Sequence, residues 1–148
     1  MTAIVRNAAP LNLRSFVMTF LFVSLWINAS EIVRYFGVVM PMVRESFSAL
    51  DNPAPMNVGV FAVWAVWMSV LVGMLIFFYW LYANRFGASV KSAVVAGSLC
   101  WLFFFFLFWV GVVNMGLGTI ETAAIALPWA WAELVIGALI ARWSFSRF

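Results

Sequence analysis

Glu133 is the acidic residue whose position most strongly indicates chemistry. It precedes Arg142 by nine residues, about 13 Å of helix rise, so we expect it deep inside an apolar, membrane-spanning segment. Charged groups at such depth are rare and costly, and they often serve transport. One hypothesis makes Glu133 a protonatable site coupled to transport. We favour the other, a neutral acid hydrogen-bonded to a neighbouring helix or a partner subunit, because no second charge is expected at the same depth.

Small residues recur around Glu133 at spacings of three and four, which places them on one helix face. They are Ala123, Ala126, Ala130, Gly137 and Ala141. Such a face lets another helix approach closely, so we predict a packing face formed by Ala126, Ala130 and Gly137. Pro128 predicts a kink one turn before Glu133.

A second group of polar residues is expected near the outer membrane surface. On the first apolar segment, Arg34 follows Glu31 by three residues, so an ion pair within the helix is available. Two interpretations stay open: a pocket for a small polar ligand or a cation, or a polar network that fixes helix rotation, which we favour. The candidate residues are Asn28, Glu31, Arg34, Tyr35, Asn114 and Glu121.

The residue types that are missing exclude several chemistries. The sequence contains no histidine, the usual axial ligand of haem and the commonest zinc ligand. Its single cysteine, Cys100, allows neither an intrachain disulfide nor a redox pair. We therefore expect no catalytic residue, no metal and no cofactor. Nine tryptophans and sixteen phenylalanines leave open a groove for a quinone, carotenoid or lipid tail, although we favour lipid contact and helix packing.

One short fragment around Glu133 resembles a known motif. The stretch Ala-Trp-Ala-Glu-Leu-Val-Ile-Gly at 130–137 is similar to the Ala-Glu-Val-Ile-Gly stretch around the membrane-embedded acid of small multidrug resistance transporters. In that family the acid lies on the first helix of a shorter chain, whereas here it falls in the fourth segment. The rest of the chain, with Ser30-Glu31 late in the first segment, resembles small bacterial inner-membrane proteins without established activity. We assign no family on these grounds.

Four apolar runs are long enough to carry these residues across a membrane. Of the 148 residues, 67% are hydrophobic and 9% are charged, whereas soluble domains average about 45–50% and about 25%. A spanning helix needs about 20 apolar residues, so little remains for a soluble domain. We predict a single transmembrane domain over 1–148, with spans at 13–36, 56–83, 90–115 and 119–142.

The positions of the basic residues predict the orientation. Six of the eight cations fall before the first span, after the fourth, or between the second and third. Because lysine and arginine are retained in the cytoplasm, we predict an antiparallel four-helix bundle with both termini cytoplasmic. We expect the first span to be retained rather than cleaved as a signal peptide. The segment 37–55 should lie outside, either as a short amphipathic helix or as a plain loop.

These features predict a non-catalytic, all-helical integral membrane protein, placed in a bacterial inner membrane. We expect an accessory or assembly subunit of a larger membrane complex, which contacts lipid and either other subunits or further copies of itself, and not nucleic acid. Short connections leave no room for an active site outside the membrane. The alternative is a small proton-coupled transporter or channel that uses Glu133.

Overall fold

Four long helical segments make up the computed structural model, which describes residues 12–51 and 55–148. All regular structure within these residues is helical. Each segment is long and apolar enough to cross a membrane. In chain order the elements are α1 (Leu13–Arg34), a π-helical turn η1 (Tyr35–Val39), α2 (Met40–Ser46), α3 (Val58–Phe86), α4 (Val90–Trp101), a second π-helical turn η2 (Leu102–Phe106), α5 (Leu107–Asn114) and α6 (Ile120–Phe145).

The first segment is longer than the sequence predicts. α1, η1 and α2 follow one another without a break over Leu13–Ser46, a segment of 34 residues. Residues 37–46 therefore form neither a separate surface helix nor a loop. Pro41 lacks the N–H that would close an ordinary α-helical turn, and the wider π-helical turn directly precedes it. The other three segments differ from their predicted bounds by at most three residues.

Short polar side chains begin the helices. The side-chain oxygen of each cap accepts a hydrogen bond from the backbone N–H three residues later, which satisfies a donor that the first turn leaves free. The caps are Asn12, Asn57, Ser89 and Thr119. At the other end of α3, Gly87 takes φ 90°, a conformation that favours glycine. These residues fix where the helices start and turn.

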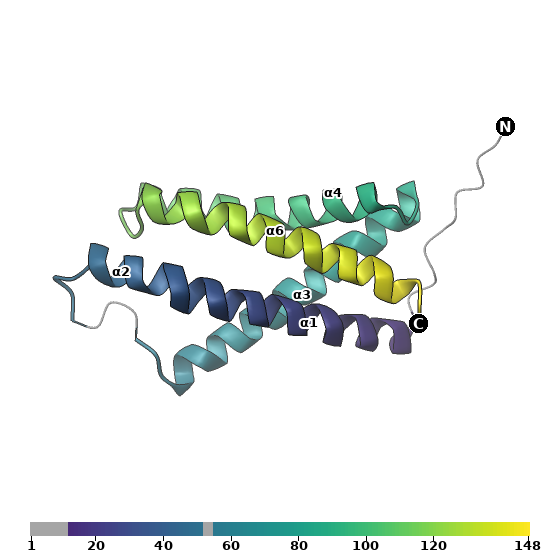
Figure 1. Cartoon of the computed structure of the whole chain (residues 1–148), viewed down its shortest axis with the longest axis horizontal. Helices are drawn as coiled ribbons and strands as arrows, with labels where there is room; N and C mark the ends of the chain where they lie inside the picture. The colour runs from purple at the N-terminus through teal and green to yellow at the C-terminus, as the bar shows by residue number, and fades with distance from the viewer. Residues whose placement is uncertain (1–11, 52–54) are drawn as a thin grey trace.

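α6 packs against both α1 and α4, and α3 packs against α1 and α4. α1 begins and α6 ends at the same end of the molecule (Figure 1). The closest approach joins α4 to α6 at Gly97, where a Cβ atom would lie 2.8 Å from Val135 Cα and 2.9 Å from Leu134 O. Only a glycine allows the two backbones to meet this closely.

The small-residue face of α6 is filled from within the chain. Ala126 and Ala130 are buried, and so is Gly137. A Cβ atom at Gly137 would lie 2.9 Å from Leu75 Cδ2 of α3 and 3.2 Å from Ile27 Cδ1 of α1. At Gly137 this face therefore packs α6 against both α1 and α3.

Tryptophan indoles tie α6 to its neighbours. The Nε1 atoms of Trp26 and Trp101 donate to the backbone oxygens of Glu133 (3.0 Å) and Leu127 (2.9 Å). From α6 itself, Trp131 Nε1 donates to Ser98 Oγ at 2.9 Å. Each bond satisfies a polar group that lipid cannot.

α3 packs along only part of its length. Its buried residues all lie between Met68 and Ala83, while none of residues 58–67 is buried. In Figure 1 this first part of α3 diverges from α1. The divergence opens the space in which the candidate site lies.

Candidate functional site

Glu31 and Arg34 of α1 form a buried ion pair. Arg34 Nε donates to Glu31 Oε2 at 3.1 Å, and Arg34 Nη2 donates to the same oxygen. The two residues are 8% and 4% exposed, and the guanidinium lies over the Phe105 ring, 5.3 Å from its centroid. At 1.5 Å per residue the pair lies about 18 Å or more from either end of the continuous helix over 13–46. The pair is therefore central in the first segment, whereas the sequence predicted it near the end of that segment.

Glu133 is buried in α6, where it is 1% exposed. Both of its carboxyl oxygens lack a hydrogen-bond partner among residues 12–51 and 55–148. The Ser30 hydroxyl interacts with this carboxyl without reaching hydrogen-bond geometry, and it accepts a hydrogen bond from Trp129 Nε1 at 3.1 Å. The acid is thus enclosed between α6 and α1 with its polar atoms unused.

The ion pair and Glu133 belong to one cluster. The charges of Glu31 and Arg34 both act electrostatically on the Glu133 carboxyl. The sequence treats them as two separate groups at different depths, and its expectation that Glu133 has no charged neighbour is wrong. We call Glu31, Arg34 and Glu133 the charged cluster. It joins the first and last segments, far from the ends of both.

The remaining candidate residues divide into two sets. Tyr35 is half-buried and its ring lies 5.8 Å from that of Trp64, while Asn28 is exposed and donates to its own helix. Both line a cavity next to the ion pair. Asn114 and Glu121 are exposed at the α5 and α6 ends and line neither cavity beside the pair. Of the predicted polar residues, only those of the first segment therefore border these cavities.

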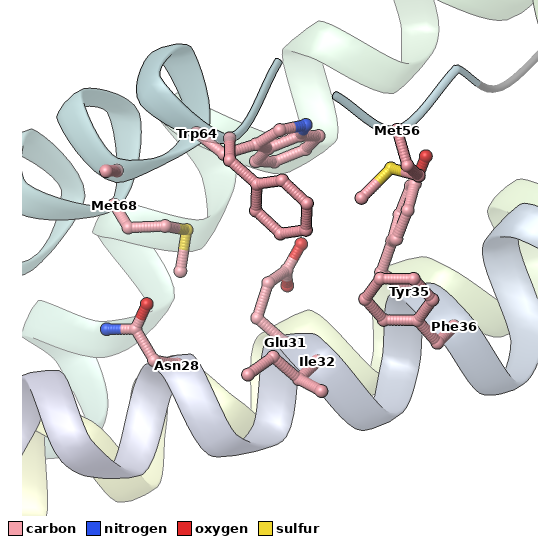
Figure 2. Close-up of a pocket in the computed structure, with 10 residues that line it drawn as sticks. Asn28, Glu31, Ile32, Tyr35, Phe36, Met56, Trp64 and Met68 are labelled. Carbon is pink, nitrogen blue, oxygen red and sulfur yellow. The ribbon is translucent and has the colours of Figure 1, made fainter. Parts of the chain in front are cut away.

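Two adjoining cavities lie between the first segment and the diverging part of α3. Their volumes are about 180 and 330 Å³, and Glu31, Tyr35 and Trp64 border both. Figure 2 shows the Glu31 carboxyl pointing from α1 into the space below α3. Arg34 borders the larger cavity, which we call the aromatic cavity. Seven of the eleven residues around it are aromatic: Tyr35, Trp64, Trp67, Phe104, Phe105, Phe108 and Trp109.

The sequence analysis left open that aromatic residues line a groove, but it favoured lipid contact and helix packing. The number of tryptophans and phenylalanines alone could not separate a cavity wall from a lipid-facing surface. Predicting the cavity requires the direction of α3, because the rings of η2 and α5 enclose a space only where α3 leaves the bundle. Nothing in a hydrophobicity pattern reports that direction.

A third hollow, the α1–α6 groove, lies on the other side of Glu133. Small residues form part of it, namely Ala29, Ser30 and Ala132, and Trp26 and Trp129 stand at its sides. Its volume is about 650 Å³. Glu133 is among the residues that border this groove, although its carboxyl oxygens are buried. Every residue that borders the groove belongs to α1 or α6.

Comparisons with known proteins assign no relative. No protein-family model matches the chain, and neither a curated protein nor a solved structure matches it. The described residues also contain no group of three or more Cys, Asp or Glu residues that could hold a metal ion. The four apolar helices indicate an integral membrane protein, and its role must be argued from the charged cluster and the hollows around it.

Proposed function

We propose that this chain is a non-catalytic accessory or assembly subunit of a larger complex in a bacterial inner membrane. In this proposal the four segments form an antiparallel bundle with both termini in the cytoplasm. The basic residues Arg14, Arg85, Lys91, Arg142 and Arg147 support this orientation, because they lie at or near the helix ends that share one end of the molecule in Figure 1.

The α1–α6 groove is the observation that carries the proposal. A carboxyl group buried in an apolar medium without a hydrogen bond is costly, and here the residue that carries it borders a groove whose lining includes Ala29, Ser30 and Ala132. Small residues let a transmembrane helix approach closely enough to form interhelical hydrogen bonds. The proposed occupant is a transmembrane helix of another subunit. A polar side chain on that helix forms a hydrogen bond with Ser30, and the Ser30 hydroxyl in turn forms one with the Glu133 carboxyl.

Filling the groove should release the partner. Ala29 is exposed and borders the groove, so Ala29→Trp adds an indole there without entering the core. The matched control is Ala62→Trp on α3, which is also exposed and borders none of the cavities described above. We expect at least a tenfold loss of the co-purified partner for Ala29→Trp and no loss for the control, measured by quantitative mass spectrometry after mild solubilisation.

A photo-crosslinking amino acid locates the contact directly. Placed at Ala29 in native membranes, it should yield one discrete crosslinked product, while at Ala62 it should yield none. Equal crosslinking from both positions would contradict a specific interface. A product between two copies of this chain would show that the occupant is a second copy, and the subunit proposal would then fail.

The charged cluster favours a second candidate, a proton-coupled transporter or channel. Three ionisable groups that act on one another across two helices are a common arrangement in proton pathways. We expect Glu133→Gln to reduce proton flux at least tenfold in liposomes that contain only this protein and an internal pH dye. Glu121→Gln is the control, because Glu121 is exposed in the first turn of α6. Wild-type liposomes that pass no more protons than empty ones would eliminate this candidate.

A further inference from the structure

The buried ion pair keeps hydrogen-bonding atoms that no neighbour uses. Both bonds from Arg34 go to Glu31 Oε2. Glu31 Oε1 and Arg34 Nη1 make no hydrogen bond within the described residues, and neither is among the polar atoms that the fold seals off. The side chains of Arg34 and Glu31 retain 5% and 11% of their surface. An acceptor and a donor without partners in the described chain therefore belong to two residues that both border the aromatic cavity.

The walls of the aromatic cavity suit a flat ring. Indole, phenol and phenyl rings from η1, α3, η2 and α5 surround it, and aromatic faces pair with other rings in stacked or edge-on arrangements. Its volume of about 330 Å³ lies at the lower end of the usual range for small-molecule sites. The cavity also reaches the lipid-facing surface, because two of its lining residues, Val63 and Phe108, are 71% and 57% exposed.

We propose that the aromatic cavity binds a membrane quinone or its quinol. The ring lies among the aromatic side chains, one ring oxygen accepts a hydrogen bond from Arg34 Nη1, and a quinol hydroxyl donates to Glu31 Oε1. The Tyr35 hydroxyl, which also makes no hydrogen bond in the described part of the chain, is the second group at this end of the cavity. The apolar tail leaves past Val63 into the lipid. The proposal concerns binding and includes no electron transfer.

Charge and hydrogen bonding favour a neutral ring over other membrane molecules. The charges of Glu31 and Arg34 cancel, so an anionic lipid headgroup meets an arginine that is already paired and a carboxylate that repels it. An acyl chain leaves Glu31 Oε1 and Arg34 Nη1 without partners in an apolar cavity, which is costly. A quinone oxygen accepts from Arg34 Nη1, and a quinol hydroxyl can also donate to Glu31 Oε1, while the ring of either fills the space between the aromatic walls.

Two probes that share a decyl tail but differ in the ring test whether the cavity recognises the oxygen atoms of the ring. The full-length protein in phosphatidylcholine nanodiscs is titrated with decylubiquinone and with decylbenzene, and intrinsic tryptophan quenching or displacement of bound decylubiquinone reports occupancy. We expect decylubiquinone to bind at least tenfold more tightly, the worth of about one hydrogen bond to a charged group. Equal affinities would overturn the proposal, and so would a lack of saturable binding by decylubiquinone.

A matched pair of valines tests the location. Val63 and Val66 are 71% and 66% exposed on the same helix, but only Val63 lines the aromatic cavity. Val63→Trp should weaken decylubiquinone binding at least tenfold, whereas Val66→Trp should leave it within twofold of the wild type. The opposite order, or equal affinities for the two variants, would place the ligand elsewhere and overturn the assignment. Because neither valine is buried, both variants are expected to fold, which is verified by thermal unfolding.

Discussion

Arg34→Met should destabilise the protein by about 3–5 kcal/mol, because it leaves Glu31 buried without its counter-charge. Arg34 donates both of the hydrogen bonds that Glu31 receives, and both residues are less than 10% exposed. Methionine keeps much of the length and apolar volume of the arginine stem, so the loss reports the ion pair and not a cavity. The free energy of unfolding is measured by sodium dodecyl sulfate titration in mixed micelles.

The double variant Glu31→Leu with Arg34→Met separates the net contribution of the ion pair to stability from the cost of removing one partner. Replacing both partners with apolar residues of similar size is often neutral or stabilising in a buried site. We expect the double variant to recover most of the stability lost in Arg34→Met. If the single variant is as stable as the wild type, then the pair is not buried as the structure places it.

Gly97→Ala should destabilise the α4–α6 contact by about 1–3 kcal/mol, the usual range for forcing extra volume into a packed core. The added Cβ would lie 2.8 Å from Val135 Cα and 2.9 Å from both Val135 N and Leu134 O. These are backbone atoms, so no side-chain rotation relieves the contact and the two helices must separate. The change is measured as a lower free energy of unfolding in mixed micelles.

Two other helical glycines provide the control for Gly97. A Cβ atom at Gly73 or at Gly111 would meet nothing within 4 Å. Gly73→Ala and Gly111→Ala should therefore leave stability unchanged or raise it slightly, because alanine restricts the unfolded chain and favours the helix. A loss of stability at Gly73 equal to that at Gly97 would show that the close approach of α4 and α6 does not exist.

The long apolar runs predicted the number of spanning segments and most of their ends. Runs that exceed the membrane thickness carry this information directly, and Gly87 and Ser89 mark the break between the second and third runs. The end of the first segment was missed, because Arg44, Glu45 and Pro41 suggested a surface region. A π-helical turn before Pro41 lets the helix continue, and a hydrophobicity pattern does not contain that turn.

The missed helix end explains why the charged cluster was not predicted. With the first helix ending at residue 36, Glu31 appears near the surface and Glu133 alone in the middle. Measured from the true ends, Glu31 lies about 22 Å from Ser46 and Glu133 about 20 Å from Ile120. The correct end would have placed the two acids at the same depth. Even the correct helix end would not have predicted the aromatic cavity, because the cavity depends on the direction of α3.

The continuous first segment has a consequence for the surrounding bilayer. A rod of 34 residues is about 51 Å long, whereas the hydrocarbon layer is about 30 Å thick. α6, with 26 residues, measures about 39 Å. The first rod must therefore tilt more than its neighbours or extend Arg44 and Glu45 well into the headgroup layer. Thinner lipid demands more tilt, so hydrophobic mismatch acts directly on the helix that carries Glu31 and Arg34.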